Sequence, residues 1–201
     1  MPDPEISLLF SPASERNKAP ILERLRVELA DCREVLEIGS GTLQHAIHFS
    51  VAMPWLRWQP TDTAAQFAAL NRACASASIA NIATPLELDV DQPQWPETDA
   101  DAMFSANTLH IMAWPSVVGM FRQLGLMAGL RRVIIYGPFK YRGAFTTASN
   151  EQFDQSLKRR DRNSGIRDFE AVNQLAQQSQ LRLAADHAMP ANNQLLVWHR
   201  N

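Results

Sequence analysis

Apolar positions along the chain alternate between helical spacing and short continuous runs. Apolar residues three and four positions apart predict an amphipathic helix over about residues 18–31, and the short run 35–38 predicts a buried strand. Helical spacing returns over residues 43–53 until Pro54 ends it, because proline lacks the N–H that a helix interior needs. The chain therefore opens with a helix, a strand, a glycine-containing turn and a second helix.

The same alternation continues through the middle of the chain. Short apolar runs predict strands near residues 56–59, 85–88 and 102–106, and helical patterns cover about residues 63–75 and 116–127. The run 133–136 is rich in β-branched residues, which is typical of a central strand. Strands that alternate with helices indicate a mainly parallel sheet with helices on both faces. We therefore expect an α/β fold of the Rossmann-like, doubly wound kind.

Residues 139–168 interrupt this rhythm with a polar stretch, which we expect to be a lid or substrate-binding insertion with a short helix near residues 151–160. A helix over residues 169–178 and strands over 181–186 and 195–199 follow. The link between these strands is too short for a crossover helix, so they should run antiparallel. We expect one domain over residues 1–201, with residues 1–31 as an N-terminal cap region.

Composition and charge narrow the class of protein. Hydrophobic residues are 46% and charged residues 20% of the 201 residues, which is typical of a folded globular chain. The net charge of -2 gives no general attraction to nucleic acid or to anionic membranes, so we expect neither as a partner. Cys32 and Cys74 stand apart, which predicts no disulfide framework and no metal site. Since no signal peptide or long apolar stretch is evident, we expect a cytoplasmic monomer or homodimer acting on a small molecule.

The turn Glu37-Ile38-Gly39-Ser40-Gly41-Thr42 lies between a predicted strand and a predicted helix. Glycine lacks a Cβ atom, so the backbone of such a turn can approach a ligand closely, and a nucleoside-containing cofactor is the natural occupant. The dinucleotide motif G-x-G-x-x-G needs a glycine where this chain has Gln44, and the phosphate loop of nucleotide hydrolases is absent. The turn therefore favours neither NAD nor ATP.

Polar residues follow the predicted strands at the ends where ligands bind in doubly wound sheets. Asp62 comes about twenty residues after the glycine turn, where an acid can accept hydrogen bonds from ribose hydroxyls. Asp89 suits an adenine amino group, Val90 beside it offers a backbone amide and apolar contact, and Asn107 suits a polar ligand tail. The alternative for Asp62 and Asp89 is that they cap the following helices or turns.

Several segments together resemble class I S-adenosylmethionine-dependent methyltransferases, and more closely the poorly characterised family of methyltransferase-like protein 26. The segments are 11–18 (SPASERNK), 36–42 (LEIGSGT), 107–110 (NTLH), 136–140 (YGPFK), 165–168 (GIRD) and 189–193 (MPANN), with the pairs Ser149-Asn150, Phe153-Asp154 and Arg160-Asp161. The resemblance implies a seven-stranded sheet whose last strand is antiparallel. It also implies S-adenosylmethionine as the cofactor.

The resemblance implies positions for that cofactor on this chain. Gly39 and Gly41 would lie under its methionine and ribose portions, Asp62 at the ribose and Asp89 near the adenine. Glu37 and Ser40, in the same turn, join the expected cofactor site with Val90 and Asn107. This sequence departs from the family at Leu43, where a third glycine is usual; a leucine directed into the core would be harmless, whereas one directed at the cofactor would weaken binding.

Methyl transfer from a sulfonium is a displacement with an activated donor, so the protein mainly aligns the acceptor and excludes water. A base is needed only where the acceptor loses a proton, and His110 is our candidate for that base. The alternative is that His110 is held by backbone hydrogen bonds. The residues 107–110 differ from the Asn/Asp-Pro-Pro-Tyr motif of enzymes that methylate amide or adenine nitrogen, which disfavours those acceptors.

Polar residues in the segments expected to cover the pocket are candidates for contact with the acceptor. They are Arg16, Asn17, Lys140, Tyr141, Arg160 and Arg167. Arginine grips carboxylate or phosphate through two parallel hydrogen bonds, although the basic run 158–162 equally fits the solvated face of a helix. We expect a small-molecule methyltransferase; the alternatives are a noncatalytic protein that binds S-adenosylmethionine or S-adenosylhomocysteine, and a protein methyltransferase.

Overall fold

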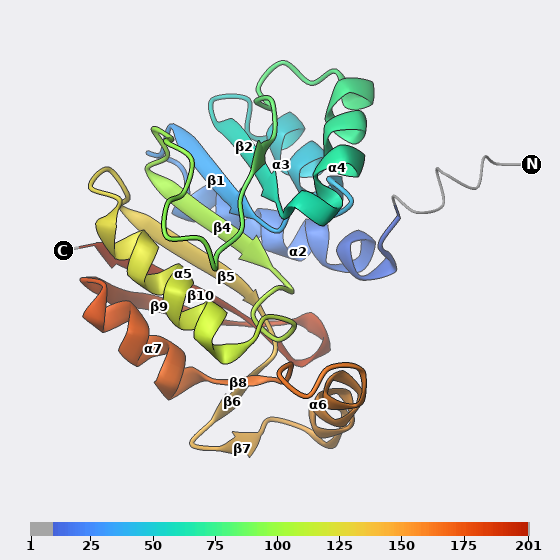
Figure 1. Ribbon diagram of the computed structural model, residues 1–201, viewed down its shortest axis with the longest axis vertical. Helices are drawn as coiled ribbons and strands as arrows, with labels where there is room; N and C mark the ends of the chain where they lie inside the picture. Colours follow the sequence, from blue (N-terminus) through green and yellow to red (C-terminus); the bar gives the residue numbers. More distant parts are fainter. Residues whose placement is uncertain (1–9, 201) are drawn as a thin grey trace, which may run out of the picture. The chain divides into compact units, whose positions relative to one another are not determined.

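The computed structural model describes residues 10–200, in which helices and strands alternate along the chain (Figure 1). The helices are α2 (Pro12–Glu28), α3 (Gln44–Ala52), α4 (Ala64–Ala77), α5 (Trp114–Leu126), α6 (Ala148–Arg160) and α7 (Phe169–Gln178). The strands are β1 (Glu34–Ile38), β2 (Arg57–Asp62), β3 (Leu86–Glu87), β4 (Ala102–Ala106), β5 (Arg132–Gly137), β6 (Phe139–Tyr141), β7 (Ala144–Phe145), β8 (Arg167–Asp168), β9 (Leu181–Met189) and β10 (Asn193–Arg200). The expected absence of a signal peptide and the first part of the expected cap region concern residues 1–9, which lie outside the described residues.

Within residues 10–200 the main sheet has seven strands in the order β3-β2-β1-β4-β5-β10-β9. β1 pairs in parallel with β2 and with β4, whereas β10 pairs antiparallel with both β5 and β9. The short 3-10 turn Pro190–Asn192 joins β9 to β10, which confirms the expected antiparallel pair. The predicted α/β class with a mostly parallel sheet is therefore correct.

The first helix begins earlier than the apolar pattern predicts. We expected about residues 18–31 with Pro20 in the first turn, but α2 starts at Pro12 and contains Pro20 in its interior. The side chain of Ser11 caps this start by accepting a hydrogen bond from the Ser14 N–H at 3.2 Å. The expected boundary was wrong because polar residues of the first turns carry no apolar periodicity, whereas the cap and Pro12 suit a helix start.

The described residues group into two compact units. The first unit comprises the residues up to Asp89 together with Pro96–Phe104, and the second comprises Val90–Trp95 and the residues from Ser105 onward. The expected division into one domain with a cap region and a lid stays a prediction. Over residues 10–200, every helix is too short or too polar to cross a bilayer.

In the first unit, aromatic side chains fill the space between helix and sheet. Phe49 of α3, Trp58 of β2 and Phe104 of β4 are fully buried, with ring centroids 5.5–5.9 Å apart. Burial of rings of this size is the main contribution to the stability of a small core. α3 is thereby held against the sheet directly after the glycine turn.

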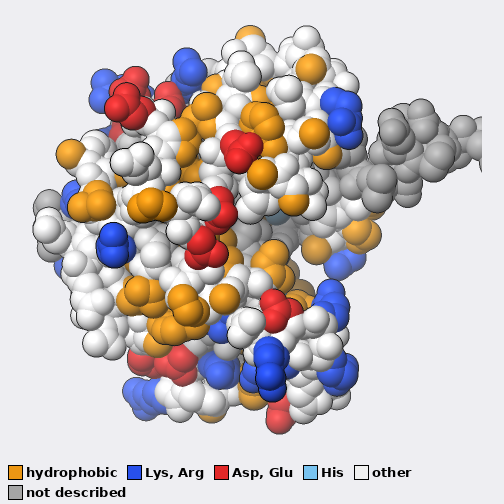
Figure 2. Space-filling view, viewed as in Figure 1, with side chains coloured by type: hydrophobic (Ala, Val, Ile, Leu, Met, Phe, Trp, Pro, Cys, Tyr) orange, Lys and Arg blue, Asp and Glu red, His pale blue; other side chains and the backbone are white. Residues whose placement is uncertain are grey.

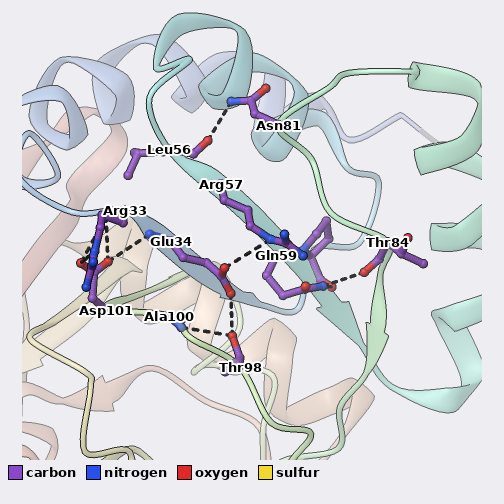
Figure 3. A network of polar contacts seen from close by, with 11 residues as sticks. Arg33, Glu34, Leu56, Arg57, Gln59, Asn81, Thr84, Thr98, Ala100 and Asp101 are labelled. Atoms are coloured by element: carbon purple, nitrogen blue, oxygen red, sulfur yellow. Dashed lines mark hydrogen bonds and ion pairs between the residues drawn. The ribbon is translucent and has the colours of Figure 1, made fainter.

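Polar contacts tie the starting ends of β1 and β2 in the first unit (Figure 3). Asp101 Oδ1 accepts hydrogen bonds from the N–H groups of Arg33 and Glu34 at 2.9 and 3.1 Å. Glu34 in turn accepts from the Thr98 hydroxyl at 2.8 Å and pairs with Arg57 at 3.2 Å. Ligands bind at the opposite, carboxyl ends of the strands in sheets of this kind.

The second unit contains a structure that the sequence pattern did not predict. Within the described part of residues 139–168, β6, β7 and β8 form a three-stranded sheet in the order β7-β6-β8. Phe139 pairs with Arg167 and Lys140 with Asp168, so the two ends of this stretch are joined. The polar stretch is therefore an ordered sheet and helix rather than a loop with one short helix.

Candidate functional site

The glycine turn between β1 and α3 repeatedly adopts the left-handed backbone conformation. Gly39, Gly41 and Leu43 have φ values of 77°, 53° and 62°. A Cβ atom placed on Gly41 would meet nothing within 4 Å, so the outer surface of the turn is open there. The turn therefore offers accessible backbone at the end of β1, as a closely bound ligand requires.

Asp62 at the end of β2 is bonded to this turn. Its Oδ2 atom accepts a hydrogen bond from the Gly41 N–H at 2.8 Å, and its Oδ1 atom accepts one from the Thr63 N–H at 2.9 Å. The side chain is half-buried. Asp62 thus holds the preceding glycine turn, while its carboxylate stays partly accessible at the strand end.

Glu37 and Ser40 support the turn from inside. Glu37 is 2% exposed, and its Oε2 atom accepts hydrogen bonds from the Ser40 hydroxyl at 2.8 Å and the Trp58 indole N–H at 3.0 Å. Burial raises the pKa of Glu37 to about 7, against the lowering effect of these two bonds. The sequence reasoning missed Trp58, because its position in a strand pattern does not reveal where its N–H points.

Asp89 follows β3 at the same edge of the first unit. The N–H of Leu88 donates to the Asp62 carbonyl at 2.9 Å, so the ends of β2 and β3 lie side by side. Asp89 is half-buried and comes directly after this contact. The structure therefore brings together the glycine turn, Asp62 and the segment of Asp89.

The start of α2 is bonded to the helix that follows the glycine turn. Gln44 Oε1 accepts hydrogen bonds from the Ser11 N–H at 2.5 Å and from the Thr42 hydroxyl at 2.9 Å. Asn17 is buried, with its Oδ1 atom 2.7 Å from His45 Nε2, and Arg16 is exposed. Of the two α2 residues among those expected to touch the acceptor, Arg16 and Asn17, Asn17 is thus bonded to His45.

Val90 and Asn107 belong to the second unit. Val90 is buried, and its carbonyl oxygen would lie 3.3 Å from a Cβ atom placed on Gly119. Asn107 directly follows β4 with a left-handed φ of 61°, and its N–H donates to the Tyr136 carbonyl at 2.9 Å. Asparagine tolerates this conformation better than most residues, which explains its place at the bend.

His110 lies in the turn after β4 and is 7% exposed. Its ring lies at 71° to the ring of Phe153 of α6, with the centroids 5.3 Å apart. Burial, and then the positive charges of Arg167 and Arg160, lower the pKa of His110 to about 4. The imidazole is therefore neutral at pH 7, and it is a weaker base than an ordinary histidine.

The guanidinium of Arg167 binds backbone carbonyl groups. Its Nε atom donates to the Leu109 carbonyl at 3.0 Å, and its Nη2 atom donates to the carbonyls of Met112 and, at 2.9 Å, Asn163. These bonds occupy the group that we expected to grip an anionic acceptor. Arg160, in contrast, is exposed at the end of α6, where Lys and Arg side chains gather in the space-filling view (Figure 2).

Lys140 and Tyr141 of β6 are both engaged within the second unit. Lys140 Nζ lies over the Phe145 ring, 5.4 Å from its centroid. The Tyr141 hydroxyl donates to Asp186 Oδ2 at 2.7 Å, and its ring stacks on Phe169 with the centroids 5.2 Å apart. Burial and the bond to Asp186 raise the pKa of Tyr141, so its hydroxyl stays protonated.

The fold is that of solved methyltransferases. The S-adenosylmethionine-dependent methyltransferase SibL in its apo form matches with a TM-score of 0.76 and 16% identity, over 93% of this chain and 55% of its own. The mitomycin 7-O-methyltransferase MmcR matches with a TM-score of 0.79 and 16% identity, over 94% of this chain and 54% of its own. An O-methyltransferase family 2 protein from Planctomyces limnophilus DSM 3776, in complex with apigenin, matches with a TM-score of 0.77 and 14% identity, over 99% of this chain and 62% of its own. At such identities the likeness shows the fold.

This chain thus has the Rossmann-like fold found in those methyltransferases, but it spans little more than half of their length. A family model matches residues 9–200. The chain belongs to this family, DUF938, which is described as a protein of unknown function.

Proposed function

We propose that this chain is an S-adenosylmethionine-dependent methyltransferase with a small-molecule acceptor. The observation that carries the proposal is the open, left-handed glycine turn bonded to the half-buried carboxylate of Asp62. The fold supports it, since three solved proteins with this fold are named as methyltransferases, one of them S-adenosylmethionine-dependent. The finer resemblance to methyltransferase-like protein 26 stays a prediction.

The residues of the first unit fit this cofactor. Gly39 and Gly41 offer backbone without a Cβ atom, and the space above Gly41 is open. Asp62 would accept hydrogen bonds from the ribose hydroxyls, and Asp89 would accept one from the adenine amino group. Glu37 and Ser40, predicted in the cofactor site, would act by holding the turn from inside, and Val90 and Asn107 remain proposed contacts of the second unit.

When bound, S-adenosylmethionine supplies a methyl group on a positively charged sulfur. Held by the glycine turn, Asp62 and Asp89, the cofactor would supply this methyl group to the acceptor atom, and the electron pair of the C–S bond would stay on sulfur. A ring nitrogen of His110 takes the proton that an acceptor hydroxyl loses in this step. The neutral imidazole has a ring nitrogen for this proton, although burial makes it a weaker base than an ordinary histidine. The names of two structural neighbours, both O-methyltransferases, support a hydroxyl as the accepting group.

The small molecules named with two structural neighbours support a small acceptor. One neighbour is a mitomycin 7-O-methyltransferase and another was solved with apigenin. Arg160 and Arg16 are exposed and remain proposed contacts for an anionic part of the acceptor, whereas Lys140, Tyr141 and Asn17 have partners within their own units. Cytoplasmic location and a monomeric or dimeric state stay predictions.

The position of Leu43 bears on the noncatalytic alternative, because a leucine directed at the cofactor would weaken binding. Its side chain is 0% exposed and belongs to the core, so it has no surface to present to a ligand. Its left-handed φ of 62° explains why glycine is usual at this position in the family that the chain resembles. The departure at Leu43 therefore gives no steric argument against cofactor binding.

Calorimetric titration with S-adenosylmethionine and S-adenosylhomocysteine tests the proposal. We expect micromolar binding by the parent chain and loss of about tenfold or more in Asp62→Ala, because hydrogen bonds to a charged group contribute about 1.5–3 kcal/mol. Asp62→Asn keeps an oxygen for the Gly41 N–H and should bind with an intermediate affinity. Asp99→Ala, at an exposed aspartate of the same unit, is the matched control and should bind like the parent.

Absence of binding by the folded parent would refute the proposal. Equal weakening in Asp62→Ala and Asp99→Ala would refute the site, because a general loss of negative charge would then account for both. If both ligands bind as expected, a screen of hydroxyl-containing metabolites for methyl transfer follows, with His110→Ala as the variant that should bind the cofactor but transfer slowly.

A further inference from the structure

The turn that carries His110 is bonded residue by residue to a single segment of the second unit. This segment is 164–167, at the end of the polar stretch that precedes α7. Arg167 donates to two carbonyl groups of the turn, through Nε to Leu109 and through Nη2 to Met112. Between these two, the Gly165 N–H donates to the His110 carbonyl at 2.9 Å, and the Ser164 hydroxyl donates to the Ile111 carbonyl at 3.0 Å. Consecutive carbonyl groups on both sides of His110 are thereby fixed.

Arg167 is suited to this task by the geometry of its side chain. The planar guanidinium directs its N–H groups in fixed directions, so one side chain can hold the carbonyls of Leu109 and Met112 at the two ends of the turn. A third bond, to the Asn163 carbonyl at 2.9 Å, orients the group from its own segment. A lysine ammonium has the same charge but lacks this planar fork.

The segment 164–167 is itself anchored to α6 by Asp154. This buried carboxylate accepts a hydrogen bond from the Ile166 N–H at 2.7 Å and pairs with Lys158 at 2.6 Å. Gly165 passes so close that a Cβ atom placed on it would lie 2.9 Å from Asp154 Oδ1. The segment is thus positioned by α6, the same helix whose Phe153 meets the ring of His110.

We propose that Arg167 is a positioning residue that orients the turn of His110, rather than a residue that grips the acceptor. The proposal rests on the proposed function, in which His110 takes the proton. It assigns a role to the segment 164–167: the polar stretch between β5 and α7 builds the support of the base. Three bonds from one guanidinium to backbone carbonyls leave this group oriented toward the protein chain.

Nuclear magnetic resonance of the whole chain tests the proposal without knowledge of the acceptor. The first readout is the titration of the His110 ring, which in the parent should stay neutral down to about pH 5, because its pKa is about 4. The second readout is the hydrogen exchange rate of the Gly165 amide, which donates to the His110 carbonyl. A positioning role predicts that loss of Arg167 changes both readouts.

Two substitutions of Arg167 separate position from charge. In Arg167→Gln, we expect the Gly165 amide to exchange about tenfold faster and the His110 pKa to rise toward the ordinary value of 6.5, because both support and positive charge are lost. In Arg167→Lys, the amide should still exchange faster, because the planar guanidinium is lost although the positive charge is kept. Arg160→Gln removes a charge that also affects His110, but the Arg160 guanidinium donates to the Ser156 carbonyl within α6, so this variant should leave the amide exchange unchanged.

Three results would overturn the proposal: unchanged amide exchange in Arg167→Gln, parent-like exchange in Arg167→Lys, or equally accelerated exchange in Arg160→Gln. If Arg167→Gln does not fold, Arg167→Lys and Ser164→Ala together test the proposal. Ser164→Ala removes only the bond to Ile111 and should therefore accelerate the exchange by a smaller factor than Arg167→Lys. Calorimetric binding of S-adenosylmethionine is measured on the same samples. Failure of that binding would refute the proposed function, whereas failure of the exchange experiment refutes only the role of Arg167.

Discussion

Replacing Leu43 by glycine and by alanine tests whether the glycine turn imposes backbone strain on this residue. Leu43 has a φ of 62° and a side chain that is 0% exposed. Both substitutions remove the buried side chain, which costs about 2–5 kcal/mol of unfolding free energy for a leucine. They differ in the backbone, because alanine keeps the strain of the left-handed conformation and glycine relieves it.

The expected difference follows from two opposing effects. The left-handed conformation costs a non-glycine residue about 1–2 kcal/mol, whereas glycine loses about 0.5–1 kcal/mol more conformational entropy on folding. Leu43→Gly should therefore be more stable than Leu43→Ala by roughly 0.5–1 kcal/mol. Leu70 is the matched control, because it is equally buried but lies inside α4 of the same unit.

At Leu70 the order of the two variants should be reversed. In a regular helix, alanine is favoured over glycine by about 1 kcal/mol, so Leu70→Ala should be the more stable variant. Urea unfolding followed by circular dichroism measures all four variants. If Leu43→Gly were less stable than Leu43→Ala, as at Leu70, the strain argument for this turn would be refuted.

Two further predictions concern Glu37 and Gly165. Because the pKa of Glu37 is raised from 4.5 to about 7 on folding, the unfolding free energy should fall by up to about 3 kcal/mol between pH 4.5 and 7. Glu37→Gln should lack this fall, and equal pH dependence of both chains would contradict the assignment. Gly165→Ala should lose about 1–3 kcal/mol, more than Gly143→Ala, because a Cβ atom on Gly165 meets Asp154 whereas one on Gly143 meets open space. Chemical unfolding measures both, and equal losses would exclude the contact with Asp154.

The elements that the sequence predicted well are those with strong local patterns. β4 and α7 have the predicted bounds, because their apolar residues follow strand and helix periodicity without interruption. The three-stranded sheet was missed because β7 and β8 have two residues each and β8 pairs with β6 across the intervening α6. A periodicity needs several residues to be recognised, so strands this short leave no pattern.

The candidate site divides in the same way. The glycine turn and Asp62 were predictable because the ends of successive parallel strands meet at one edge of a sheet. The support of that turn by Trp58 and the support of the His110 turn by Arg167 were not. The bond of Trp58 spans 21 positions of the sequence and that of Arg167 spans 58. The geometry of each bond depends on how the backbone brings its two segments together.

The sequence by itself determined the alternation of strands and helices, the antiparallel pair at the end of the chain and the polar residues at the strand ends. These properties follow from the spacing of apolar residues and from the length of the connecting segments, which are local quantities. Only the tertiary structure decided that Leu43 is buried and that the guanidinium of Arg167 binds backbone carbonyls. The direction and burial of a side chain depend on segments distant in sequence, which the order of residues does not display.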